Sequence, residues 1–200
     1  MSLIKQTSSQ QRSLQQNPSH RWNVRYLALV GLMAAVIGVF GPLVLPLPFS
    51  PVPISLASFA VYFSAYVLGK RGGTLSCIIY LFIGLMGVPV FSGFSAGPGK
   101  LLGPTGGYLI GYLFMAWLCG LFAEKWPHKA LLQFVGMVLG TLACYVLGSI
   151  WLSFQADLSF QAALAAGVLP FIPGDLVKII VSMIVGKQIR RRLQKINFWS

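Results

Sequence analysis

The feature that most constrains this chain is a run of 44 residues, from Tyr26 to Gly69, without a charged side chain. As a single helix this run would be about 66 Å long, roughly twice the thickness of the hydrocarbon core of a bilayer. The run must therefore hold two membrane-spanning segments. Prolines at positions 42, 46, 48, 51 and 53 mark the division between them. Because proline removes a backbone donor and disfavours helix at the preceding residue, we predict an extended connector over 46–53.

Composition supports a membrane protein. Hydrophobic residues make up 56% of the chain and charged residues 9%, whereas an average soluble domain is about 25% charged. A soluble globule with so few charges could not cover its surface, which excludes a soluble enzyme, and the apolar content excludes a disordered chain. We therefore predict a multi-pass protein of the cell membrane.

The residue inventory also restricts chemistry. Three acids and two histidines leave few groups for acid–base catalysis or metal binding, and there is no phosphate-binding P-loop. We expect no enzymatic activity, no ATP hydrolysis by this chain, no metal and no cofactor. Three cysteines, Cys77, Cys119 and Cys144, lie in apolar runs without a CxxC partner, and we interpret them as small core residues.

Further apolar stretches complete the predicted fold, an all-α membrane domain with six transmembrane helices over 23–192. Beyond the two spans in the first run, spans are expected at about 74–91, 105–123 and 130–152, with a short element at 158–168 and a final span that begins near Gly174. The Ser- and Gln-rich segment 1–22 is predicted to be a disordered or surface-lying basic tail. Residues 193–200 are predicted to be a short cytoplasmic tail.

The placement of charge predicts the orientation. With six spans, 13 of the 15 Lys and Arg residues fall on one side of the membrane. Under the positive-inside rule, both termini are cytoplasmic. Topology and contact with membrane lipid therefore explain the net charge of +12 better than binding to nucleic acid, which we do not expect.

The three connections on the opposite side, 46–53, 92–104 and 153–173, are nearly uncharged and rich in residues that set unusual backbone geometry. Irregular backbone near membrane depth persists only where protein buries it or where it lines a cavity. We predict a substrate pocket on the outward side beneath these first, third and fifth loops. The alternative is that they are ordinary short turns.

Asp175 and Lys178 are the strongest candidates for ligand binding. They lie three residues apart in an apolar segment, just after a break at 170–174, and therefore share one helix face. An ionisable residue within a span costs about 2.5–3.5 kcal/mol and usually faces a cavity or a partner. We expect Asp175 to accept ligand N–H groups and Lys178 to attract a ligand anion. The alternative is an internal ion pair with Asp175 as the helix N-cap.

The Gly-rich loop and the start of the fourth span add further candidates. Lys100 could reach a ligand carboxylate, although it could equally be only solvated. Gly106, Gly107 and Tyr108 begin a helix whose free N–H groups favour an anionic or carbonyl group. Close helix packing is the alternative reason for these glycines. Aromatic side chains expected at the pocket are Phe49, Phe91 and Tyr108.

Small residues form stripes at helical spacing on two spans, which permits close helix contact in lipid. One stripe comprises Ala28, Gly31, Ala35 and Gly38, and the other comprises Gly136, Gly140, Cys144 and Gly148. We interpret both as internal packing. For the first stripe, the alternative is a docking face for a partner protein.

Four motifs resemble the BioY family, the biotin-binding membrane subunits (S components) of energy-coupling-factor transporters. They are PVPIS at 51–55, GVPVF at 87–91, GPTGGYL at 103–109 and PFIPGDLVK at 170–178, and the resemblance extends over about 24–190. It implies a six-helix protein that captures biotin from outside and works with a coupling subunit and two ATPases on other chains. It also implies that Asp175 and Lys178 contact biotin and that Lys100 is a further candidate contact.

The same resemblance implies that the stripe around Gly31 and Ala35 contacts the coupling subunit. The pocket chemistry agrees, because biotin presents a ureido group, an apolar thioether ring and an anionic valerate chain. Two alternatives remain open at this point. The protein could be an S component for another vitamin, or a structural or assembly protein of the membrane.

Overall fold

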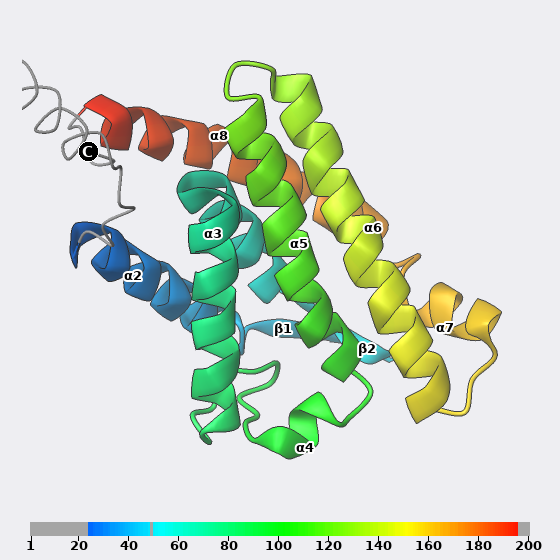
Figure 1. Cartoon of the computed structure of the whole chain (residues 1–200). Coiled ribbons are helices and arrows are strands. Elements are labelled where there is room, and N and C mark those ends of the chain that lie inside the picture. Colours follow the sequence, from blue (N-terminus) through cyan, green and yellow to red (C-terminus); the bar gives the residue numbers. More distant parts are fainter. Residues whose placement is uncertain (1–23, 49, 196–200) are drawn as a thin grey trace, which may run out of the picture.

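The computed structural model describes residues 24–48 and 50–195, with side chains described to residue 193. The predicted tail at 1–22, the candidate Phe49 and most of the tail at 193–200 therefore lie outside the described residues. Helices and strands follow one another along the chain (Figure 1), in this order: α2 (Val24–Phe40), β1 (Val44–Leu47), β2 (Ser50–Ser55), α3 (Ala57–Leu85), α4 (Pro98–Leu101), α5 (Gly106–Lys125), α6 (Ala130–Gln155), α7 (Phe160–Gly167) and α8 (Ile172–Lys195).

Several of these helices suit a membrane. By length and composition, three of the described helices, α3, α5 and α6, could cross it, although α3 reaches this length only when both sides of a break at Gly69 are counted. The pair α7 and α8 adds a fourth span if it is counted as one bent segment. Helix α2 is a shorter apolar helix of 17 residues. Large apolar side chains such as Phe82, Leu131 and Val177 are exposed on the outer faces, where lipid would cover them. The chain is thus a mainly helical, multi-pass membrane protein.

The predicted second and third spans are the two arms of α3. The sequence suggested a connection around Lys70 and Arg71, but the break is a single residue, Gly69, with φ of +76°. A Cβ on Gly73 would lie 2.5 Å from Ala65 Cα, although residues eight apart in a straight helix are separated by about 12 Å. The arms 57–68 and 70–85 are therefore folded against each other.

The tight turn at Gly69 depends on the end of α5. Glu124 Oε1 accepts a hydrogen bond of 3.1 Å from the N–H of Lys70, the first residue after the break. A Cβ on Gly69 would lie 2.0 Å from the same carboxylate oxygen. Only glycine combines a positive φ with this close approach, so no loop is needed between the two arms.

The predicted extended connector is an antiparallel β-hairpin. Val44 pairs with Ser55 and Leu45 with Ile54, and the register shifts between Leu45 and Leu47, around Pro46. In a two-stranded sheet both strands are edges, where the missing N–H of proline is tolerated. The prediction of an all-α fold is wrong at this hairpin, because proline predicts extended backbone without showing what that backbone pairs with.

The two other outward connections follow the prediction more closely. The Gly-rich loop 92–104 contains only the one-turn helix α4, and Gly93 and Gly97 have positive φ. The break between α7 and α8 lies at 168–171, slightly before the predicted 170–174, and the two helices are bent by 50° relative to each other. Ser159 caps α7 by accepting a hydrogen bond from the N–H of Ala162. The final helix runs further than expected, to Lys195.

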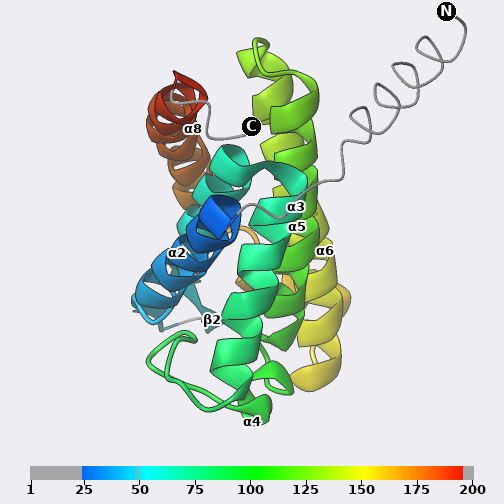
Figure 2. The ribbon, with the colours of Figure 1, turned by 60° about the vertical axis from the view of Figure 1, so that its left-hand side comes forward.

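Helix α5 occupies the centre of the bundle and packs between α3 and α6 (Figures 1 and 2). The small-residue stripe of α6 faces α5: a Cβ on Gly136 would lie 2.2 Å from Phe122 Cβ, and one on Gly148 would lie 2.3 Å from the Tyr108 ring. The interpretation of this stripe as internal packing is confirmed. All three cysteines are buried, as predicted.

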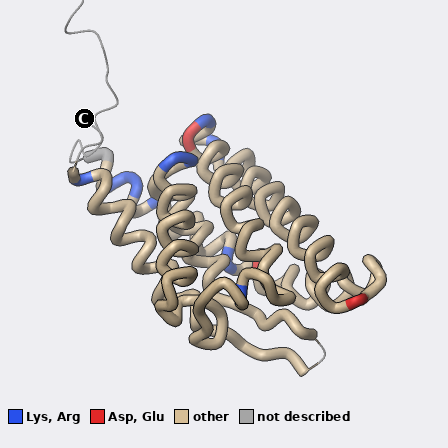
Figure 3. The backbone as a smooth tube through the Cα atoms, turned by 60° about the horizontal axis from the view of Figure 1, so that its bottom comes forward, with Lys and Arg blue, Asp and Glu red and all other residues tan. Residues whose placement is uncertain are grey.

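Charged residues gather at one end of the bundle, around the Gly69 break, the end of α5 and the last turns of α8 (Figure 3). There Arg190 on α8 donates hydrogen bonds to Ala123 O at 2.9 Å and to Tyr66 O at 3.2 Å. One basic side chain thus satisfies carbonyls at the C-terminal ends of both α5 and the first α3 arm, where unpaired carbonyls carry partial negative charge.

Candidate ligand-binding site

A cavity lies at the other end of the bundle, close to the β-hairpin. It has about 660 Å³ of atom-free space, counted together with the solvent at its open mouth. Its walls come from the end of α2, from β2, from both arms of α3, and from α5, α6 and α8, with the end of α7 beside them. Ser50 Oγ donates to Ala166 O at 2.8 Å and so fastens the hairpin to α7.

A buried ion pair stands on the α8 wall. Asp175 Oδ1 and Lys178 Nζ are 2.9 Å apart, and both residues line the cavity. Only 6% of Asp175 is exposed. The one-turn spacing read from the sequence therefore brings the two charges into direct contact on the cavity wall, as a pair on one face of the helix.

Neighbouring groups satisfy this pair. Lys178 Nζ also donates to Ser55 O at 2.8 Å and to Ser58 Oγ at 3.0 Å, so the ammonium uses all three of its donors. Asp175 Oδ2 accepts a hydrogen bond of 2.6 Å from Tyr145 OH on α6. Because α8 begins at Ile172, Asp175 lies in its first turn and is not the N-cap that the alternative interpretation supposed.

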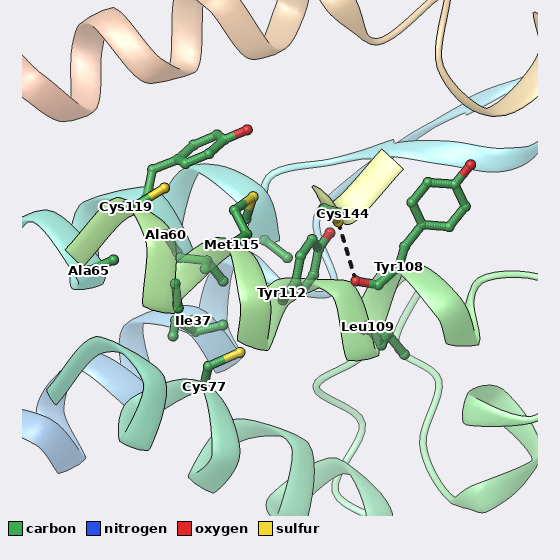
Figure 4. Packing of buried hydrophobic residues seen from close by; sticks show 14 of the residues in the cluster. Ile37, Ala60, Ala65, Cys77, Tyr108, Leu109, Tyr112, Met115, Cys119 and Cys144 are labelled. Carbon is green, nitrogen blue, oxygen red and sulfur yellow. Dashed lines mark hydrogen bonds between the residues drawn. The ribbon is translucent and has the colours of Figure 1, made fainter. Parts of the chain in front are cut away.

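Hydroxyl-bearing side chains form much of the remaining wall. Tyr62 OH and Thr141 Oγ1 are 2.6 Å apart, and Tyr108 OH donates to Gly167 O at 3.0 Å. Tyr108, Tyr112 and Met115 project from successive turns of α5, and the weak bond from Cys144 Sγ to Tyr108 O is the dashed line in Figure 4. Outside the ion pair, the residues that line the cavity are therefore uncharged, and they combine tyrosine rings with smaller hydroxyl-bearing and apolar side chains.

The other predicted site residues divide into two groups. Tyr108 lines the cavity, but Gly106 and Gly107 do not. Instead, a Cβ on Gly106 would lie 1.6 Å from Leu101 O and one on Gly107 would lie 2.3 Å from Trp151 Cβ. These glycines serve close packing at the start of α5, which was the alternative interpretation.

Phe91 and Lys100 also lie outside the cavity lining. Phe91 is fully buried, and its ring meets the Tyr80 ring edge to face at 5.6 Å between centroids. Phe91 therefore supports a lining residue from behind. Lys100 sits on α4, where partial burial lowers the pKa of its ammonium.

The small-residue stripe of α2 faces outward. Ala28, Gly31 and Ala35 are exposed, whereas Gly38 is half-buried with its Cα beside Val90. The side of α2 that packs into the bundle carries Val30, Met33, Ala34 and Ile37. The interpretation of this stripe as internal packing is therefore wrong for its first three members.

Several cavity residues were missed from the sequence. They belong to hydroxyl-bearing pairs four residues apart on three helices, namely Ser58 with Tyr62, Thr141 with Tyr145, and Tyr112 with the correctly predicted Tyr108. Residues four apart share a helix face, so each pair presents polar groups to one side of an otherwise apolar span. The recurrence of these pairs in apolar spans could therefore have predicted which helix faces line the pocket.

The fold and the cavity define a class: a membrane-embedded protein with a small-molecule site between its helices. A family model described as the BioY family matches residues 11–195. The chain belongs to the BioY family. Among its relatives is "Biotin transporter BioY" of Thermotoga maritima, 39% identical over 168 residues that cover 84% of this chain and 97% of the relative.

A second relative and a solved structure support the same family. "Biotin transporter BioY2" of Lactococcus lactis subsp. cremoris is 34% identical, with 86% of this chain and 93% of that protein covered. A crystal structure of "the S-component for biotin from an ECF-type ABC transporter" superimposes with a TM-score of 0.79 at 33% identity, over 84% of this chain and 92% of that one. Both the sequence and the shape of this chain are thus those of a transporter subunit.

Proposed function

We propose that this protein is a biotin-binding S component, which captures biotin for uptake across the cell membrane. The observation that carries the proposal is the buried Asp175–Lys178 pair on the wall of an open cavity between the helices. Membership of a family whose relatives are named biotin transporters supports biotin as the ligand. Transport of an unmodified vitamin needs no covalent chemistry, so we do not expect the chain to be an enzyme.

The proposed contacts follow from charge and hydrogen-bonding type. Asp175 accepts ureido N–H groups of biotin, and Lys178 attracts the valerate carboxylate. Because Lys178 already uses its three donors, it must exchange one of them, such as the bond to Ser58 Oγ, for the ligand. Tyr108 and the other cavity tyrosines cover the thioether ring. Lys100 on α4, which does not line the cavity, is proposed as a further cation for the carboxylate.

We further propose six crossings, formed by α2, the two arms of α3, α5, α6 and α8, with both termini in the cytoplasm. The charged end that holds Lys70 and Arg190 would then face the cytoplasm, and the cavity would open to the outside. The exposed stripe Ala28–Gly31–Ala35 would receive a transmembrane coupling subunit, because small residues let a partner helix approach closely. Two ATPase subunits on other chains would supply the energy.

Binding of radiolabelled biotin to the purified protein in lipid nanodiscs tests the proposal. We expect saturable binding of one biotin per chain, competed by unlabelled biotin but not by riboflavin or thiamine. Saturable binding of one of those vitamins, with none of biotin, would assign a different ligand to the same fold. Absence of binding to all three would favour a structural role.

A further inference from the structure

Two buried hydroxyl groups on the cavity wall have no hydrogen-bond partner among the described residues. They belong to Tyr80, on the second arm of α3, and to Thr105, at the start of α5. Tyr80 is 1% exposed and Thr105 is 8% exposed. Buried polar groups in folded proteins are almost always paired, so two unpaired hydroxyls in one cavity need a physical reason.

The fold holds both groups in place without using their hydroxyls. The Tyr80 ring is fixed by its edge-to-face contact with Phe91, which in turn packs so closely on Gly84 that a Cβ there would lie 2.2 Å from the Phe91 ring. Thr105 is the N-cap residue of α5, yet its side chain caps no backbone N–H. Neither hydroxyl is therefore required for the helix or the turn that carries it.

On the wall that carries the ion pair, by contrast, the polar groups are already hydrogen-bonded. The three donors of Lys178 are all engaged, and the carboxylate of Asp175 is bonded by Lys178 and Tyr145. Tyr62 and Tyr108 are also paired, with Thr141 and Gly167. Among the described residues that line the cavity, the fully buried hydroxyl oxygens without a partner are those of Tyr80 and Thr105, which lie on elements other than α8.

We propose that the hydroxyls of Tyr80 and Thr105 donate hydrogen bonds to acceptor atoms of the bound ligand and form a second polar subsite besides the Asp175–Lys178 pair. The identity of the ligand rests on the proposed function, and biotin offers such acceptors in its ureido oxygen and its carboxylate. Phe91 acts as a positioning residue, because it orients the Tyr80 ring without reaching the cavity.

Tyr80→Phe and Thr105→Val test this subsite, because each removes a hydroxyl and keeps the shape of the side chain. The structure also offers matched controls. Thr74 Oγ1 and Ser64 Oγ are likewise buried without a partner among the described residues, but they do not line the cavity. Radiolabelled-biotin affinity and the unfolding temperature without biotin are measured for Tyr80→Phe, Thr105→Val, Thr74→Val and Ser64→Ala.

We expect Tyr80→Phe and Thr105→Val each to weaken biotin binding by about three- to tenfold, which is the usual value of one neutral hydrogen bond. Their unfolding temperature without biotin should stay the same or rise, because an unpaired buried hydroxyl is lost. Thr74→Val and Ser64→Ala should bind biotin like the wild type.

Two results would overturn the inference: wild-type affinity in both cavity variants, or a fall in unfolding temperature that accompanies the loss of affinity. A wild-type protein that fails to bind biotin would instead contradict the proposed function.

Discussion

Tyr145 on α6 donates a hydrogen bond of 2.6 Å to Oδ2 of Asp175 on α8, while Lys178 holds the other carboxylate oxygen at 2.9 Å. The carboxylate is thus bonded by residues of two helices, and its orientation in the cavity does not depend on α8 alone. A hydrogen bond to a charged acceptor contributes about 1.5–3 kcal/mol when it is buried. Tyr145 therefore both stabilises the fold and orients the proposed ligand-binding acid.

Tyr145→Phe should lower the free energy of unfolding by about 1.5–3 kcal/mol and weaken biotin binding, because Asp175 loses a donor that orients it. Thermal unfolding and radiolabelled-biotin binding measure the two effects. Tyr66→Phe is the matched control, since Tyr66 OH donates to Gln133 Oε1 at 2.7 Å near the charged end of the bundle. It should cost about 1 kcal/mol of stability and leave affinity unchanged. Equal affinity in Tyr145→Phe and the wild type would refute the orienting role.

Lys178→Met should destabilise the protein by about 3–5 kcal/mol and reduce biotin affinity at least about 30-fold, because it leaves Asp175 buried without its counter-charge. The double variant Asp175→Asn with Lys178→Met removes both charges. Because no unpaired charge remains, it should recover much of the stability without recovering biotin binding. Unfolding temperature and biotin affinity separate these effects. A stable double variant that binds biotin normally would show that the pair serves internal packing and does not bind the ligand.

Gly31→Leu should leave biotin binding unchanged and weaken assembly with the coupling subunit. The position is exposed and a Cβ there meets no atom within 4 Å, so the fold accepts the larger side chain while a closely packed partner helix would not. Co-purification of the S component with tagged coupling and ATPase subunits measures assembly. Leu131→Trp is the control on α6, which lies across the bundle from α2 (Figure 2). Normal assembly of Gly31→Leu would exclude this face as the docking surface.

Gly69→Ala should lower the unfolding temperature more than Gly87→Ala. Both glycines have positive φ, at +76° and +101°, and each substitution carries a backbone cost of about 1–2 kcal/mol. At Gly87 a Cβ meets no atom within 4 Å, whereas at Gly69 it collides with the carboxylate of Glu124. The additional loss in Gly69→Ala therefore measures that collision. Equal losses in the two variants would show that Glu124 moves aside freely.

Much of the architecture followed from local patterns. The proline cluster predicted extended backbone at the hairpin, and the glycines and prolines of 92–104 and 170–174 predicted the loop and the break, because these residues act on their own backbone. The one-turn spacing of Asp175 and Lys178 placed them on one face for the same reason. By contrast, the turn at Gly69 depends on Glu124, which lies 55 positions further along the chain, and no local pattern carries that information.

The candidate site shows the same limit. Gly106 and Gly107 were expected to approach the ligand, but their lack of a side chain serves Leu101 and Trp151 instead. A glycine indicates that another group approaches the backbone closely, but it does not show whether that group is a ligand or another part of the protein. Tyr145 and Tyr80 were missed, because a tyrosine in an apolar span is ordinary until its hydroxyl is seen to meet a carboxylate or to stand unpaired.

The single-residue turn at Gly69 also bears on biosynthesis. The first arm of α3, residues 57–68, is about 18 Å long, well short of the roughly 30 Å hydrocarbon core, and the charged residues Lys70 and Arg71 follow its closing turn directly. A segment of this length is a poor signal for insertion by itself. We therefore expect the two arms to leave the translocation machinery together as one helical hairpin, whose charged turn stays at the membrane surface.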